Sequence, residues 1–445
     1  MQNDTIFAMA TAPGRAAIAV CRMSGPGARD AVLRLAGRVP PPRRAQLSRL
    51  AHPVSGEAID DALIFYFPAP RSYTGEDCAE LQVHGGTAIA RALIEALGAL
   101  GLRAAEPGEF TRRAFLNGKL DLAQAEGVAD LVDAETESQR RQALRQLEGR
   151  LSRQVESWRQ SLLGIAARLE AELDFSDEGD LAELMMSNIV IDDIRQLTSE
   201  MREALWHART GERLRDGLRI VIAGVPNAGK SSLLNALARR DVAIVSEHPG
   251  TTRDALEVHL DLAGYPVTVV DTAGLRDASD AVEQIGIGRA MQRAEAADLI
   301  LWLVEPGSAA LAPPRFGGSG DVWTIATKCD IAPPGWLPGT TPPAKLSLSA
   351  VTGAGLEQLE AALEGFARER LEIDVGVPAL TRERHRQALA AAVEALQRIA
   401  ADPGLPPEIV AEEIRVSQNA VGRIAGRIDI EDVLGEIFGR FCIGK

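Results

Sequence analysis

The sequence predicts a multidomain fold of the α/β plus all-α class, in which an α+β segment comes first and an α/β domain interrupts a helical region. Three observations predict it: a glycine-rich loop joins an apolar run to a helical pattern, strands alternate with helices over residues 216–372, and apolar residues recur at helical spacing on both sides of that region. We place the domains at 1–118, 119–215, 216–372 and 373–445.

Composition excludes several classes of protein. The chain has 445 residues, of which 46% are hydrophobic and 25% charged, as in ordinary soluble globular proteins. The four cysteines are far apart and form no C-x-x-C pair, so we expect no disulfide framework or zinc site, and a reducing cytoplasm fits. We expect no signal peptide and no membrane span. The net charge of −14 disfavours broad nucleic-acid binding but permits a local basic patch for one RNA.

The first domain, residues 1–118, alternates strand and helix patterns. Strands are expected at Ala16–Cys21 and Ala62–Phe67, a helix at Ile89–Leu100, and a further strand within 74–86 between glycine turns. Arg22, Glu80 and His84 fall on or beside these strands. Taken alone, such residues are ordinary solvated surface groups.

The all-α regions flank the α/β domain. Helical spacing covers residues 121–159, 187–215, 382–401, 406–415 and 429–441, with an acidic break at 174–180. The chain ends in Phe441, Cys442, Ile443, Gly444 and Lys445, for which a frayed terminus is the ordinary interpretation.

The α/β domain shows a regular succession of elements. The first strand and helix, 218–223 and 232–240, precede a hairpin-like pair at 256–262 and 266–270, a helix at 285–297, strands at 299–304, 322–327 and 345–349, and a helix at 356–370. Strands that alternate with helices predict a parallel, doubly wound sheet.

The stretch Gly224–Ser231 reads G-x-x-x-x-G-K-S between the first strand and helix, which is the context of a P-loop. Its glycines let backbone N–H groups converge on phosphate oxygens at a helix N-terminus. Lys230 is expected to reach the β- and γ-phosphates, and the Ser231 hydroxyl to reach Mg²⁺.

Four further signals follow in chain order. The stretch 250–254 supplies a threonine for Mg²⁺ and the γ-phosphate, and Asp271 at a strand end places a carboxylate at the metal. Asp330 in the stretch 327–330 can accept hydrogen bonds from guanine N1 and N2, and residues 349–350 offer a backbone N–H to guanine O6. The order of these weak matches indicates a GTP site rather than an ATP site.

Leu275 occupies the position after the D-x-x-G glycine, where Ras-like GTPases carry a glutamine that orients the attacking water. A leucine side chain makes no hydrogen bond. Another group must therefore position the water, and an added cation would supply charge near the phosphates.

At this point the motifs identify a resemblance over essentially the whole chain. GVPNAGKSSLLNAL, GTTRD, DTAGLR, VEQIGIGRA, TGED, PGEFTRRAFLNGKLDLAQAE and the terminal FCIGK together resemble the MnmE (TrmE) family of tRNA-modification GTPases. The resemblance implies an N-terminal α+β folate-binding-type domain that mediates homodimerisation. It also implies a helical-bundle domain interrupted by a Ras-like P-loop α/β G domain.

The resemblance assigns roles within the G domain. The family's potassium ion maps to Asn227, Ser246, His248 and Thr251, Mg²⁺ to Ser231 and Thr252, and the catalytic carboxylate that orients water to Glu283. The expected GTP-binding set is Asn227, Ala228, Gly229, Lys230, Ser231, Ser232, Ser246, Glu247, His248, Pro249, Gly250, Thr251, Thr252, Asp271, Thr272, Ala273, Gly274, Thr327, Lys328, Asp330, Ser349 and Ala350.

The resemblance also implies a tetrahydrofolate derivative bound by Arg22, Glu80, Lys119 and Lys445. A carboxylate suits the paired N–H donors of a pterin, and cations suit the glutamate tail. The implied partners are tRNA, GTP or GDP, and the flavoprotein MnmG, which carries FAD. Together the two proteins add an aminomethyl-type group to C5 of the wobble uridine. Cys442 lies in the terminal motif, where a buried structural thiol is the simpler role.

One residue departs from the family's pattern, and two alternative functions remain open. Thr327 stands where the family usually has asparagine, so we expect guanine affinity to be lower by about 1 kcal/mol from one lost hydrogen bond. A GTP-regulated assembly switch acting on ribosomes or RNA is the alternative of another class, because a P-loop fold does not fix function. An ATPase is the other alternative, which Asp330 disfavours because its carboxylate suits guanine rather than adenine.

Overall fold

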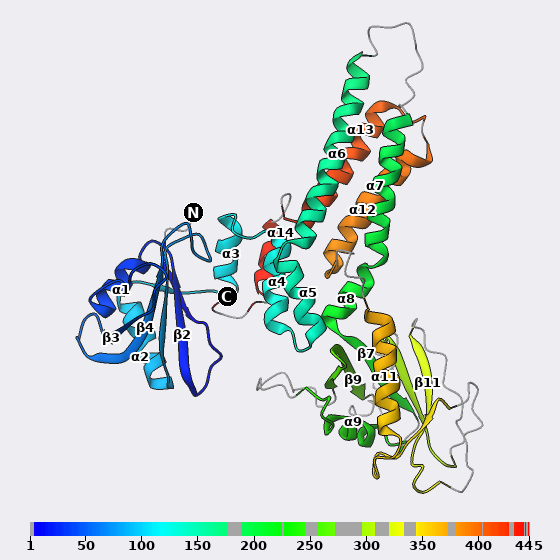
Figure 1. The fold of residues 1–445 in the computed structure, drawn as a ribbon, viewed down its shortest axis with the longest axis horizontal. Helices are drawn as coiled ribbons and strands as arrows, with labels where there is room; N and C mark the ends of the chain where they lie inside the picture. Colours follow the sequence, from blue (N-terminus) through cyan, green and yellow to red (C-terminus); the bar gives the residue numbers. More distant parts are fainter. Residues whose placement is uncertain are drawn as a thin grey trace, which may run out of the picture. The chain divides into compact units, whose positions relative to one another are not determined.

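The computed structural model describes residues 4–175, 188–224, 227–244, 257–271, 296–307, 320–332, 344–372, 380–402, 404–426, 431–439, 441 and 444 (Figure 1). These form two compact units, one of residues 1–129, 147–167 and 414–445, the other of residues 130–146 and 168–413. The boundaries of the four domains proposed above stay predictions.

The first unit contains a six-stranded sheet in the order β3-β4-β5-β2-β1-β6. Its strands are β1 (Ile6–Met9), β2 (Ala16–Ser24), β3 (Gln46–Ala51), β4 (Ala58–Phe67), β5 (Cys78–Gly85) and β6 (Arg103–Ala104). All neighbours are antiparallel except β1 and β6, which are parallel. Alternate residues of β2, β4 and β5, such as Met23, Ile64 and Leu81, are buried against α1 (Ala28–Ala36) and α2 (Thr87–Ala99).

The strands and helix expected at 16–21, 62–67, 74–86 and 89–100 are confirmed, with shifted ends. The sequence did not predict β1, β3, β6, α1 or α3 (Glu109–Leu116), most of which are short.

Helices of the first unit hold the end of the chain. They include α4 (Leu122–Asp133), α6 (Arg150–Phe175), α13 (Pro407–Ile424) and α14 (Glu431–Gly439), the three longest of which continue into the second unit. Phe438 of α14 and Phe441 pack on Leu122, and a Cβ on Gly444 would lie 2.7 Å from the Met9 carbonyl oxygen. The described part of the tail is therefore packed on β1 and not frayed.

The second unit is built on a sheet in the order β12-β11-β10-β7-β9-β8. Its strands are β7 (Leu218–Gly224), β8 (Glu257–Leu262), β9 (Tyr265–Asp271), β10 (Leu299–Val304), β11 (Asp321–Ala326) and β12 (Leu346–Ser347). All pairs are parallel except the β8–β9 hairpin. The predicted parallel sheet with one hairpin is confirmed, whereas the helix expected at 285–297 lies almost wholly outside the described residues.

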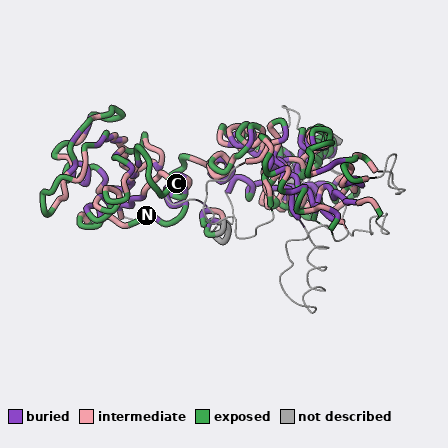
Figure 2. The backbone as a smooth tube through the Cα atoms, turned by 90° about the horizontal axis from the view of Figure 1, so that it is seen from below, coloured by how far each residue is buried: buried purple, intermediate pink, exposed green. Residues whose placement is uncertain are grey.

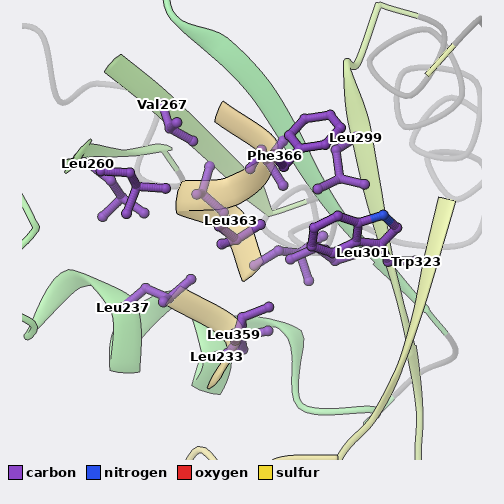
Figure 3. Packing of buried hydrophobic residues seen from close by; sticks show 14 of the residues in the cluster. Leu233, Leu237, Leu260, Val267, Leu299, Leu301, Trp323, Leu359, Leu363 and Phe366 are labelled. Carbon is purple, nitrogen blue, oxygen red and sulfur yellow. The ribbon is translucent and has the colours of Figure 1, made fainter. Parts of the chain in front are cut away.

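The core of this unit lies between the sheet and two helices on the same face, α9 (Lys230–Ala238) and α11 (Leu356–Leu371). Figure 3 shows Leu233 and Leu237 of α9 and Leu359, Leu363 and Phe366 of α11 facing strand side chains. Val221, Val270 and Trp302 form a second cluster. All residues of β10 are buried, so this central strand carries an apolar run rather than alternation. Figure 2 shows buried and exposed stretches of backbone over the described residues.

Helices precede and follow this sheet in the second unit. They are α5 (Glu137–Leu147, up to residue 146), α7 (Asn188–Trp206), α8 (Ala208–Asp216) and α12 (Glu383–Ala401). Helix α7 packs along α12, and the Thr381 hydroxyl donates to Gln146 Oε1 at 2.9 Å. No helix among the described residues is both long and apolar enough to cross a membrane.

Candidate functional site

The nucleotide site begins where β7 ends. Gly224 has φ 151°, and a Cβ there would lie 2.6 Å from the Leu303 carbonyl oxygen, so only glycine fits this close approach. Asn227 is left-handed at φ 64°. Gly229, with φ 93°, caps α9, whose first residue is Lys230. The Lys230 ammonium donates to the Gly224 carbonyl at 3.0 Å, which folds the lysine back over the loop.

Two groups expected at Mg²⁺ meet directly. The Ser231 hydroxyl, in the first turn of α9, donates to Asp271 Oδ2 at 2.6 Å, and Asp271 is fully buried at the end of β9. These two hard oxygen donors fit a Mg²⁺ ion that keeps further ligands from water and phosphate. Groups of three or more His, Cys, Asp or Glu that would make an all-protein metal site do not occur in the described part of the chain.

The loops expected to recognise the base are tied to the P-loop. The Thr327 hydroxyl, 3% exposed, donates to the Ala228 carbonyl at 2.8 Å and lies 3.2 Å from the Val304 carbonyl oxygen. Lys328 is left-handed and pairs with Glu305, and Asp330 is exposed after it. The Ser349 hydroxyl accepts the N–H groups of Val351 and Thr352, which shapes the neighbouring loop around Ala350.

The predicted nucleotide residues that the structure describes are Asn227, Ala228, Gly229, Lys230, Ser231, Ser232, Asp271, Thr327, Lys328, Asp330, Ser349 and Ala350. They lie on the loops that follow β7, β9, β11 and β12, at one edge of the sheet, as expected for a doubly wound fold. Those outside the described residues are Ser246, Glu247, His248, Pro249, Gly250, Thr251, Thr252, Thr272, Ala273, Gly274 and Glu283.

The β8–β9 hairpin links this site to a helix of the same unit. Strand β8 follows residues 245–256, and β9 ends at Asp271, one of the residues expected at Mg²⁺. At the turn, the Gly264 carbonyl accepts the Ser138 N–H at 3.1 Å, and His259 lies 3.3 Å from Glu135. Ser138 belongs to α5, so the hairpin that ends at Asp271 is hydrogen-bonded to a helix.

A second candidate site is a cavity of about 450 Å³ in the first unit. It is lined by Arg22, Arg43, Phe67, Arg71, Ser72, Tyr73, Cys78, Glu80 and Lys119. Three of the four residues expected to bind folate are therefore brought together. The fourth, Lys445, lies outside the described residues, and its neighbour Gly444 is packed against Met9 of β1.

The register of the sheet creates the centre of this cavity. Arg22 on β2 is directly opposite Glu80 on β5, and its Nε donates to Glu80 Oε1 at 2.9 Å. The Arg22 guanidinium also lies 5.5 Å from the Tyr73 ring centroid and 5.9 Å from that of Phe110. Burial raises the pKa of Tyr73, whose hydroxyl is 2.8 Å from that of Thr111. The cavity thus offers an ion pair beside aromatic rings, which suits a flat heterocycle with N–H donors.

The sequence did not single out Arg43, Phe67, Arg71 or Tyr73 as cavity residues. Tyr73 directly precedes the TGED motif, and this proximity was the only signal in the sequence. His84 does not line the cavity and instead pairs with Asp60 at 2.8 Å. Burial raises the pKa of Cys21 to about 12, so this thiol stays protonated and structural.

The P-loop, the Ser231–Asp271 contact, the bond from Thr327 to the P-loop and the parallel sheet define the class of protein, a P-loop GTPase-type domain built into a helical chain. Comparisons with known proteins narrow this class. Residues 5–119 match the family model for the GTP-binding protein TrmE N-terminus, and residues 122–442 match the model for the MnmE helical domain.

Full-length relatives indicate the same family as these models. The tRNA modification GTPase MnmE of Beijerinckia indica is 53% identical over 443 residues, which cover 99% of this chain and 96% of the relative. The protein of the same name from Rhodopseudomonas palustris is 51% identical over 445 residues, covering 100% of this chain and 99% of the relative. This chain therefore belongs to the MnmE family of tRNA modification GTPases.

Proposed function

We propose that the chain hydrolyses GTP in the cytoplasm as a homodimer, and that with the flavoprotein MnmG it modifies C5 of the wobble uridine of certain tRNAs. The observation that carries this proposal is the Ser231–Asp271 contact at the end of the P-loop, in a chain of this family. A serine hydroxyl and a buried carboxylate at this place are the Mg²⁺ partners that GTP hydrolysis requires.

The work of the G domain divides among its own residues. Lys230, which now donates to the Gly224 carbonyl, would bind the β- and γ-phosphate oxygens, and Ser231 and Asp271 would hold Mg²⁺. Asp330 would select guanine by accepting hydrogen bonds from its N1–H and N2–H groups. Residues 250–252, which lie outside the described residues, would supply a threonine, Thr252, for Mg²⁺ and the γ-phosphate.

A potassium ion is proposed to supply the positive charge that an arginine finger supplies elsewhere. Asn227, Ser246, His248 and Thr251 would hold it, of which the structure describes Asn227, in a left-handed turn of the P-loop. The side-chain carbonyl of asparagine is a hard oxygen donor that suits an alkali cation. Because Leu275 cannot orient water, Glu283 is proposed to hold the attacking water through a hydrogen-bonded bridge.

The cavity of the first unit is proposed to bind a reduced folate that donates the one-carbon unit. Glu80 would accept the N–H donors of the pterin, Arg22 would hold Glu80 in place, and Lys119 and Lys445 would bind the glutamate carboxylate. FAD is proposed to belong to MnmG alone. Arg22→Ala or Glu80→Ala should weaken 5-formyltetrahydrofolate binding in calorimetry and leave GTP hydrolysis unchanged. An unaltered folate affinity would remove this assignment.

GTP hydrolysis is proposed to drive a conformational cycle. The support for this step is the hydrogen bond between the β8–β9 hairpin and α5. A conformational change in the residues before β8 or after Asp271 would displace a strand of this hairpin and, through the hydrogen bond, α5. The bond directly couples the end of the nucleotide site at Asp271 to helix α5.

Mass spectrometry of tRNA nucleosides tests the proposal. A strain without the gene should lack the aminomethyl-type group on the wobble uridine. The wild-type gene should restore it, and a Lys230→Ala gene should not. Unchanged nucleosides with altered ribosome profiles would favour the assembly-switch alternative, and competition of GTP binding by ATP would favour an ATPase.

A further inference from the structure

The rim of the cavity in the first unit carries three exposed cations, Arg43, Arg71 and Lys119. Deeper in the cavity, Glu80 is already paired with Arg22 at 2.8 Å. In the ranges that the structure describes, none of the three rim cations forms an ion pair with a carboxylate. The lining therefore has an excess of positive charge at its rim.

Contacts with neighbouring backbone carbonyls hold two of these cations, Arg43 and Lys119, beside residues 70–71, and Arg71 lines the same cavity. The Arg43 guanidinium donates to the Arg71 carbonyl, and the Lys119 ammonium donates to the neighbouring Pro70 carbonyl at 3.0 Å. Arg43 is left-handed at φ 60°, its N–H donates to the Tyr66 carbonyl at 2.9 Å, and its guanidinium lies 6.0 Å from the Phe67 ring centroid.

Cations that are held together repel one another, and an anion that bridges them removes this cost. A single carboxylate can form ion pairs with only one or two of the three cations. A ligand with several carboxylates spaced along a flexible chain can pair with all three cations, and its affinity rises through multivalency without a new pocket.

We propose that this rim binds the poly-γ-glutamate tail of a reduced folate, so that the site is selective for polyglutamylated over monoglutamylated folates. The inference rests on the proposed folate role of the cavity. The heterocycle lies beside the Arg22–Glu80 pair, and the added glutamates extend past Lys119 toward Arg43 and Arg71.

Calorimetry with two ligands tests the proposal on the full chain. Each exposed ion pair adds modestly to affinity, so two further carboxylates should make 5-formyltetrahydrofolate triglutamate bind about tenfold more tightly than the monoglutamate. In the double variant Arg43→Gln, Arg71→Gln, this ratio should fall below about twofold. Arg44→Gln, a neighbouring exposed arginine outside the lining, should keep the full ratio. Unchanged GTP affinity and thermal unfolding would show that the double variant is folded.

The outcomes separate the two proposals. Equal affinity of the wild-type chain for both folates overturns polyglutamate selectivity but keeps the folate cavity. Absence of binding by either folate overturns the folate cavity itself. A double variant that keeps the tenfold ratio but binds tRNA more weakly would assign the rim to RNA phosphates and overturn the proposal. A preference for the triglutamate that weakens with added KCl supports it.

Discussion

Thr327 offers a quantitative test of the nucleotide site, because an asparagine is usual at this position in the family. The threonine hydroxyl has a single proton, and the structure directs it to the Ala228 carbonyl at 2.8 Å. That bond ties the base-recognition loop to the P-loop, but no proton of Thr327 is left for guanine N7. An asparagine amide has two N–H groups and can make both bonds.

The expected gain follows from one added hydrogen bond. A net contribution of about 1 kcal/mol makes Thr327→Asn bind GTP about fivefold more tightly. Thr327→Val, which has nearly the same shape, removes the proton and leaves the buried Ala228 carbonyl without it. This variant should lower the free energy of unfolding of the G domain by about 1–3 kcal/mol.

Calorimetric titration with GTP in Mg²⁺ and KCl measures the first effect, and urea unfolding followed by tryptophan fluorescence measures the second. The order of GTP affinity should be Asn above Thr. An asparagine variant with the wild-type dissociation constant would refute the assignment of N7. A valine variant as stable as the wild type would show that the hydrogen bond from Thr327 to the Ala228 carbonyl contributes nothing to stability.

Two other predictions concern catalysis and pH. Glu283→Ala should lower GTP turnover by about 10²–10⁴-fold with GTP binding kept, and loss of binding in a nucleotide titration would instead mean a structural role. The hydrogen bond from Arg103 lowers the pKa of Asp4, and although burial raises the pKa of Glu109, hydrogen bonds from Arg103 and Arg113 bring it below its usual value. Carboxylates with lowered pKa stabilise the fold at neutral pH, and this stability is lost as the pH falls below about 4 and through their folded pKa values. Arg113→Met should therefore lower the free energy of unfolding at neutral pH and reduce the part of it that is lost on acidification, measured by urea unfolding at pH 7 and at about pH 3; an unchanged pH dependence would contradict this.

Most of the second sheet could be predicted from sequence. Strands such as β7 and β10 are continuous apolar runs bounded by loops, and each recognition motif follows a strand end, so order alone places the motifs at one edge. The tie between Thr327 and Ala228 could not be predicted, because it joins positions 99 residues apart through a backbone carbonyl.

The first unit was less predictable. Strands β1 and β6 have four and two residues, too few for a period to be recognised. The pairing of Arg22 with Glu80 spans 58 residues and depends on strand register, so the sequence did not predict it. The family resemblance implied only that both residues belong to one folate site. Arg43 and Arg71 look like any exposed arginines in the sequence, and only the fold places them on one cavity.

The account depends most on the proposed potassium ion in the GTP site. The direct measurement is the rate of GTP hydrolysis by the purified chain with KCl replaced by NaCl at equal ionic strength. If K⁺ supplies charge in the transition state, turnover should be much faster in KCl. Equal rates in the two salts would contradict the central claim.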